Sequence, residues 1–133
     1  MRIIELALVI STLVVSAGCR TATIYNATNV PVLSASNNRL TLDDVTRGVL
    51  AAGKSKGWVM DQVRPGEIIG SLTTNQHLAE ATVTYDTSRF SITYKNSKNL
   101  LHAGNEIHKR YNVWISELQA AIQDEMIRLP AQK

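Results

Sequence analysis

The side chains that most often carry chemistry are few in this sequence. Cysteine occurs once, at Cys19, and histidine three times, as His77, His102 and His108. None of the histidines is spaced i, i+4 from another, and none stands in the H-E-x-x-H order that brings two imidazoles to one metal ion. We therefore expect no metal site and no cofactor. The histidines are interpreted as structural or solvated side chains, although a folded-back loop could bring His102 and His108 together in an enzyme site.

Sequence motifs for hydrolysis or phosphate binding are also absent. Gly70-Ser71 lacks the surrounding glycines of the G-x-S-x-G elbow, and Gly53-Lys54-Ser55 has no preceding strand that would make it a phosphate-binding loop. The acidic residues fall on predicted outer faces or helix ends, where carboxylates are normally solvated. These observations favour a protein that is not an enzyme.

Residues 1–19, MRIIELALVISTLVVSAGC, have the pattern of an export signal. Arg2 lies beside the amino terminus, a mostly apolar run follows from Leu6 to Val15, and small residues come last. A membrane-spanning helix needs about 20 apolar residues, and Glu5 and Arg20 bound a shorter run. We therefore predict a signal peptide over residues 1–18.

The end of this segment, Val15-Ser16-Ala17-Gly18-Cys19, resembles the lipobox of bacterial lipoproteins. The resemblance covers the signal region alone. It implies that Cys19 carries a diacylglyceryl group on its thiol, that the peptide is cut before Cys19, and that the new amino terminus is acylated. Two or more acyl chains hold a protein on a bilayer almost permanently. Arg20, in the position where an aspartate would signal retention in the inner membrane, implies the periplasmic face of the outer membrane, with the inner membrane as the alternative.

The charge of the chain argues against nucleic acid as a partner. The 133 residues hold 14 lysines and arginines against 11 acids, a formal net charge of +3, and the cations are scattered among the acids. Nucleic-acid-binding domains normally concentrate their cations in one stripe. Two basic clusters, one around Trp58 and one around residues 95–110, could still meet an envelope polyanion, although a soluble surface is the simpler interpretation.

Residues 19–40 are predicted to form a lipidated amino terminus and a flexible tether. Residues 20–40 are rich in Thr, Ala, Asn and Ser, and Pro31 cannot donate a hydrogen bond within a sheet. The short apolar pieces at residues 24–25 and 30–33 leave open the alternative that this segment docks on the domain as an extended edge.

A single α+β domain is predicted over residues 41–133. Thr41 can cap a helix whose first turn holds Asp43 and Asp44. Four strands are predicted at residues 58–63, 67–74, 77–85 and 89–95, where the apolar residues alternate or the composition is β-rich, with short breaks between them. A loop is expected at residues 96–105, followed by a second helix from about Glu106 to Ile127, where apolar residues step by three or four. The order α-β-β-β-β-α indicates an antiparallel meander with both helices on one face.

The candidate binding residues lie around Trp58 and at the end of the last predicted strand. They are Trp58, Tyr94, Asn96, Ser97, Lys98 and Asn99. We expect a membrane-tethered periplasmic lipoprotein that binds another envelope protein or component. The alternative is a binder of a small amphiphile, a lipid or a cell-wall fragment, in a crevice between sheet and helices near Trp58, Tyr94 and Trp114. The sequence leaves the oligomeric state open.

Overall fold

The computed structural model describes residues 20–35 and 39–129. The predicted signal peptide, Cys19 and the last four residues lie outside this part of the chain. Along the chain the described residues form β1 (Thr21–Thr23), β2 (Ala27–Pro31), α1 (Leu42–Ser55), β3 (Val59–Arg64), β4 (Glu67–Thr74), β5 (His77–Tyr85), β6 (Arg89–Lys98), β7 (Glu106–His108) and α2 (Lys109–Arg128).

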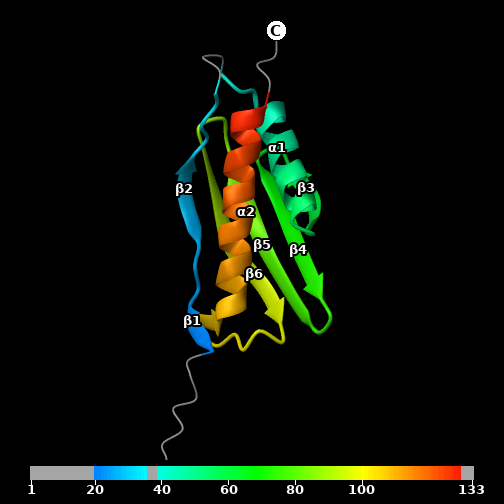
Figure 1. The fold of residues 1–133 in the computed structure, drawn as a ribbon, viewed down its shortest axis with the longest axis vertical. Coiled ribbons are helices and arrows are strands. Elements are labelled where there is room, and N and C mark those ends of the chain that lie inside the picture. The colour runs from blue at the N-terminus through cyan, green and yellow to red at the C-terminus, as the bar shows by residue number, and fades with distance from the viewer. Residues whose placement is uncertain (1–19, 36–38, 130–133) are drawn as a thin grey trace, which may run out of the picture.

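Five of the strands make one antiparallel sheet in the order β2-β6-β5-β4-β3. Strands β3 to β6 are the predicted meander, and β2 adds a fifth strand beside β6. Both helices lie on one face of this sheet, α2 over its centre and α1 toward β3 (Figure 1). The predicted α+β class and the one-sided arrangement of the helices are thereby confirmed.

The first helix begins where the sequence places its cap. The Thr41 hydroxyl accepts a hydrogen bond from the Asp44 amide at 3.1 Å, and the Asp44 carboxylate accepts one from the Thr41 amide at 2.8 Å. This reciprocal pair satisfies two of the backbone donors that a helix start leaves free. Gly57, with φ of +83°, follows the helix in a left-handed conformation that glycine adopts without strain.

The core lies between the inner face of the sheet and the two helices. The sheet contributes alternate residues of β4, β5 and β6, and α2 contributes the predicted stripe. The fully buried members of largest volume include Tyr111, Phe90, Ile68, Ile92, Ile115, Leu118 and Ile122. The alternation and the helical spacing in the sequence predicted this division because a strand buries every second residue and a helix every third or fourth.

The tether prediction is wrong for residues 21–31. Strand β1 pairs with β7 in a two-stranded sheet, with Thr21 opposite His108, and β2 pairs with β6, with Val30 opposite Phe90. Ala27 and Val30 are buried in the core. The alternative, an extended edge docked on the domain, is the arrangement observed. The local composition favours a flexible chain, but pairing with strands far along the sequence orders this segment.

Two boundaries near the second helix also differ from the prediction. Strand β6 continues to Lys98, because a bulge between its pairings with Glu80 and Ala81 keeps its last residues in register with β5. Residues 106–108 form β7 rather than the first helical turn, and α2 begins at Lys109. His108 caps that helix, as its side chain accepts a hydrogen bond from the Arg110 amide at 3.0 Å.

Candidate functional site

The face of the large sheet that points away from the helices is left uncovered by them in the described part of the chain. We call it the outer face and define it by the side chains of Ile69, Ser71, Glu80, Thr82 and Thr93. In Figure 1 both helices lie on the opposite side of the sheet. A sheet with one covered face and one bare face can accept a second protein on the bare one.

Pairing across the strands places these side chains in rows. Ile69 lies between Asp61 on β3 and Thr82 on β5, and Thr82 lies opposite Thr93 on β6. The neighbouring row joins Ser71 to Glu80. The surface therefore mixes short hydroxyl side chains with the branched apolar side chain of Ile69 and the carboxylate of Glu80. Such a mixture is typical of non-obligate protein–protein interfaces. These interfaces are about as apolar as the rest of the protein surface.

The β3 edge adds backbone hydrogen-bonding groups to this surface. Strand β3 pairs with β4 alone within the described chain, so its outer backbone groups are free to meet another strand. Val59 is 72% exposed and Val63 is 45% exposed, both unusually high for valine in a strand. A bulge between Gln62 and Arg64 bends the edge, which is one way that proteins limit indiscriminate pairing.

An ion pair closes one end of the β3 edge. The Arg64 Nε lies 3.1 Å from the Glu67 Oε2 across the turn that joins β3 to β4. Both side chains are accessible to solvent, so the pair adds little stability. It marks the polar rim of the edge, beside the exposed Val63.

The structure separates the residues that the sequence singled out. Trp58 is only 4% exposed, and its indole packs so closely on Gly70 that a Cβ there would lie 3.1 Å from the ring. It is a core residue. Tyr94 is half-buried on β6, on the face that the helices cover. The centroid of its ring lies 4.6 Å from that of His102 and 5.5 Å from that of Tyr111.

The predicted polar loop is in large part the end of strand β6. The Tyr94 hydroxyl and the Ser97 hydroxyl share a hydrogen bond of 2.8 Å, which holds the two side chains together along β6. Asn96 and Lys98 are exposed on the strand, and Asn99 follows it with a φ of +59°. The Asn99 side-chain amide donates to the Gln76 carbonyl at 3.2 Å, so it is bound to the β4–β5 turn and not to the neighbouring backbone expected of asparagine in a turn.

The three histidines bind separate backbone groups. His77 Nδ1 lies 2.7 Å from the Asn99 carbonyl, and His102 Nε2 lies 3.0 Å from the Gly104 carbonyl. His108 caps α2, as described above. Within residues 20–35 and 39–129, no cluster of three His, Cys, Asp or Glu side chains could hold a metal ion. These hydrogen bonds to the backbone indicate a structural role for each histidine.

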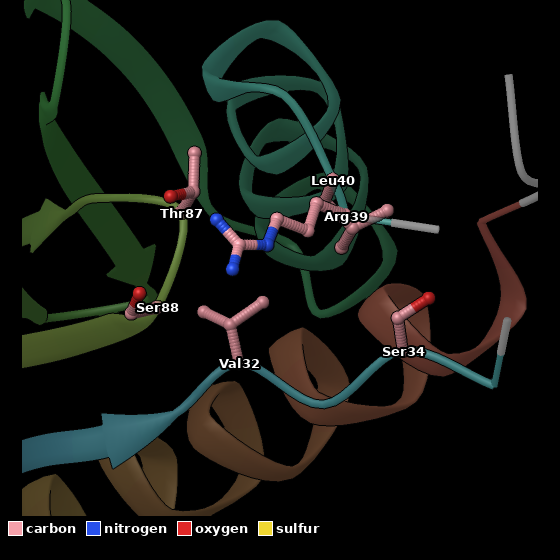
Figure 2. Close-up of a pocket in the computed structure, with 6 residues that line it drawn as sticks. All are labelled: Val32, Ser34, Arg39, Leu40, Thr87 and Ser88. Atoms are coloured by element: carbon pink, nitrogen blue, oxygen red, sulfur yellow. The ribbon is translucent and has the colours of Figure 1, made fainter. Parts of the chain in front are cut away.

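A polar cavity of about 390 Å³ lies between the connection from β2 to α1 and the β5–β6 turn. Figure 2 shows the Arg39 guanidinium extending toward Thr87 and Ser88, with Val32 and Ser34 on the opposite wall. Sequence reasoning missed this pocket because its walls come from two connections that are far apart in the sequence. One guanidinium and hydroxyl groups can attract a small anion, but they form no acid–base pair for catalysis.

Neither the cavity near Arg39 nor four further cavities on the described residues, one of them between the exposed sides of α1 and α2, are lined by Trp58, Tyr94 or Trp114. The space between the sheet and α2 is filled by side chains that are inaccessible to solvent, such as Tyr111 and Ile115. The crevice expected between the sheet and α2 is therefore occupied by core side chains in the described part of the chain.

Among the described residues, neither helix is long and apolar enough to cross a membrane. Compared with models of protein families, with curated proteins and with solved structures, the chain gives no match.

Proposed function

We propose that this protein is a lipid-anchored, non-enzymatic binding protein of the bacterial envelope, and that its outer face and β3 edge hold another envelope protein. The anchor in this proposal is the acyl group implied by Val15-Ser16-Ala17-Gly18-Cys19. The binding role rests on one observation: both helices cover a single face of the sheet and leave the other face and one edge open.

A protein partner suits this surface better than a small ligand. Three of the five side chains that define the outer face, Ser71, Thr82 and Thr93, are short, which permits close approach of a second backbone. The β3 edge can extend the sheet by one strand from a partner, a mode in which main-chain hydrogen bonds supply affinity. Exposed Val59 and Val63 would then be covered, and Arg64 with Glu67 would lie at the rim.

Site-specific photo-crosslinking in the envelope tests the proposal. A photoreactive amino acid at Thr82, in the middle of the outer face, should give a discrete adduct with another envelope protein, as should one at Val59. The matched control is the same amino acid at Glu117, which is exposed on the helix side. Adducts from Glu117 but not from Thr82 or Val59 would contradict the assignment of the binding face.

A substitution refines this test. Thr82→Arg adds a long cation to the centre of the outer face without entering the core, so it should abolish the Val59 adduct while the thermal unfolding midpoint stays within a few degrees of wild type. Ala120→Arg, exposed on α2, should leave the adduct intact. An adduct that survives Thr82→Arg would show that the partner binds elsewhere.

A further inference from the structure

The chain immediately after Cys19 is fixed to the folded domain. The Arg20 carbonyl accepts a hydrogen bond from the Lys109 amide at 2.9 Å, and Thr21–Thr23 pairs with β7. One peptide link, about 3.8 Å between Cα atoms, joins Cys19 to Arg20. An acyl group on Cys19, as the proposed function requires, would therefore hold this end of the domain at the bilayer surface.

We call this end the basal surface and define it by residues 20–23, 73–78 and 94–111. In Figure 1 it is the lower end of the long axis, where β1, β7, the start of α2 and the β4–β5 turn meet. The β5–β6 turn and the end of α2 lie at the opposite end.

Positive charge is concentrated on the basal surface. Its segments hold five cations, Arg20, Lys95, Lys98, Lys109 and Arg110, and a single acid, Glu106. The other residues after Cys19 hold eight cations and nine acids. The basal surface thus has a formal net charge of +4 and the other residues after Cys19 have one of −1, so the excess positive charge lies at the end next to Cys19, although Arg20 is far from the other four cations in the sequence.

Cations from separate elements surround one turn on this surface. Arg110, at the start of α2, lines a cavity of about 430 Å³ with Thr74, Gln76 and His77. Lys98, at the end of β6, lines an adjoining cavity of about 300 Å³ that shares these β4–β5 residues. The Lys109 backbone amide donates a hydrogen bond to the Arg20 carbonyl. The cations therefore border a connected surface that faces away from the body of the domain.

We propose that the basal surface rests on the anionic headgroups of the lipid bilayer and fixes the orientation of the anchored domain. Phosphates of acidic lipids complement the charge of Lys98, Lys109 and Arg110, and the acyl chains keep them within reach. Each cation at an anionic bilayer surface raises the population of the docked orientation about fivefold. The long axis of the domain then stands away from the bilayer, and the outer face of the sheet is presented sideways to a partner.

The test uses the acylated full chain, reconstituted into vesicles of phosphatidylethanolamine with or without phosphatidylglycerol. A fluorophore is attached to one introduced cysteine, either Gln76→Cys on the basal surface or Thr87→Cys at the opposite end, since acylation blocks the only native thiol. A quencher placed at the lipid headgroups should quench the label at position 76 much more than the label at 87. The difference should be larger with phosphatidylglycerol.

Charge reversal supplies the matched comparison. Lys98→Glu with Arg110→Glu should reduce the quenching at position 76 at least severalfold, while the protein stays on the vesicles through its acyl chains. Arg39→Glu with Arg89→Glu changes the net charge equally at the opposite end and should leave the quenching unchanged. Circular dichroism should show that both pairs remain folded, as all four side chains are exposed.

Three results would overturn the inference: equal quenching at positions 76 and 87, no effect of the basal reversal, or equal effects of both reversals. Basal reversal that abolishes cosedimentation with peptidoglycan but leaves the quenching unchanged would assign the surface to the cell wall and also overturn it. Loss of the wild-type protein from vesicles would contradict the anchored function itself, whereas retention without differential quenching contradicts the orientation alone.

Discussion

The Lys109 amide donates a hydrogen bond of 2.9 Å to the Arg20 carbonyl, which joins the first turn of α2 to the residue that follows Cys19. The two residues are far apart in the sequence, so this contact exists only in the folded domain. It leaves no spacer between the predicted lipid anchor and the domain. An acyl group on Cys19 would consequently hold the domain at a position set by the fold and not by a linker.

Hydrogen exchange should distinguish this docked segment from a flexible one. The Ile24 amide donates to the Asn105 carbonyl at 2.9 Å, and the Val32 amide donates to the Ser88 carbonyl at 2.8 Å. We expect both amides to exchange at least a hundredfold more slowly than unstructured peptide, because each must open before it exchanges. Exchange at the unstructured rate for both amides would mean that residues 20–35 are a tether after all.

The stability of the domain should depend on pH through Asp44. Hydrogen bonding from the Thr41 backbone amide, opposed in part by burial, lowers the pKa of Asp44 below its ordinary value of 3.8. A lowered folded pKa means that the unfolded chain binds the proton more readily, so the contribution of Asp44 is present above pH 4 and is lost as the pH falls through the folded pKa. Urea unfolding of Asp44→Asn should therefore show a shallower loss of stability below pH 4 than wild type. An identical slope would contradict this role.

The helix cap itself can be tested at neutral pH. Thr41→Ala removes the hydroxyl that accepts from the Asp44 amide and should lower the free energy of unfolding by about 1 kcal/mol. Thr41→Ser retains an acceptor and serves as the control, with a loss below about half that value. Equal losses in the two variants would show that the hydroxyl is not the stabilising group.

Two buried tyrosines should respond differently to loss of their hydroxyl groups. Thr46 donates its hydroxyl proton to the Leu42 carbonyl at 2.9 Å, so the Tyr85 hydroxyl must be the donor in its 2.6 Å hydrogen bond with Thr46. Tyr85→Phe should therefore cost about 1 kcal/mol of unfolding free energy. The buried Tyr111 hydroxyl has no hydrogen-bond partner within the described part of the chain, and burial raises its pKa.

Tyr111→Phe should accordingly leave the unfolding free energy unchanged or raise it, because it removes a polar group that is buried without compensation. Chemical denaturation of both variants checks the contrast. A loss of 1 kcal/mol or more in Tyr111→Phe would indicate a partner for that hydroxyl.

Close packing between α1 and β3 provides a further test. A Cβ at Gly53 would overlap the thioether of Met60. Gly53→Ala should cost about 1–3 kcal/mol of unfolding free energy, despite the better helix propensity of alanine. In Gly53→Ala with Met60→Ala the obstructing atoms are gone, so the double variant should lose less than the sum of the single losses. Strict additivity would contradict the proposed overlap.

Much of the fold follows from local sequence patterns. The cap at Thr41 and the alternation in residues 77–85 and 89–95 predicted elements that the structure contains, because these signals depend on neighbours within a few residues. Strands β1 and β7 were not predicted, and β2 was foreseen only as the alternative of a docked edge, since each of these strands is short and gains order from a partner far along the chain. The bulge that extends β6 to Lys98 has a similar non-local origin.

The candidate site was less predictable than the fold. Trp58 was proposed for binding because a large aromatic residue stood beside lysines, but the close approach of Gly70 buries it in the core. The outer face could be foreseen from the polar positions of the alternating strands. The basic cluster at residues 95–110 was also recognised in the sequence. Its position beside residues 20–23 and 73–78 could not be foreseen, because these segments come together only through the pairing of β1 with β7 and the turns of the meander.

Mass spectrometry of the mature amino-terminal peptide, purified from bacterial membranes, tests the central claim most directly. We predict that the chain begins at Cys19 with a diacylglyceryl group on the sulfur, and that Cys19→Ser protein lacks this modification and does not fractionate with membranes. An amino terminus at another residue, or an unmodified Cys19 in membrane-bound protein, would contradict the claim that an acyl anchor holds this domain at the bilayer.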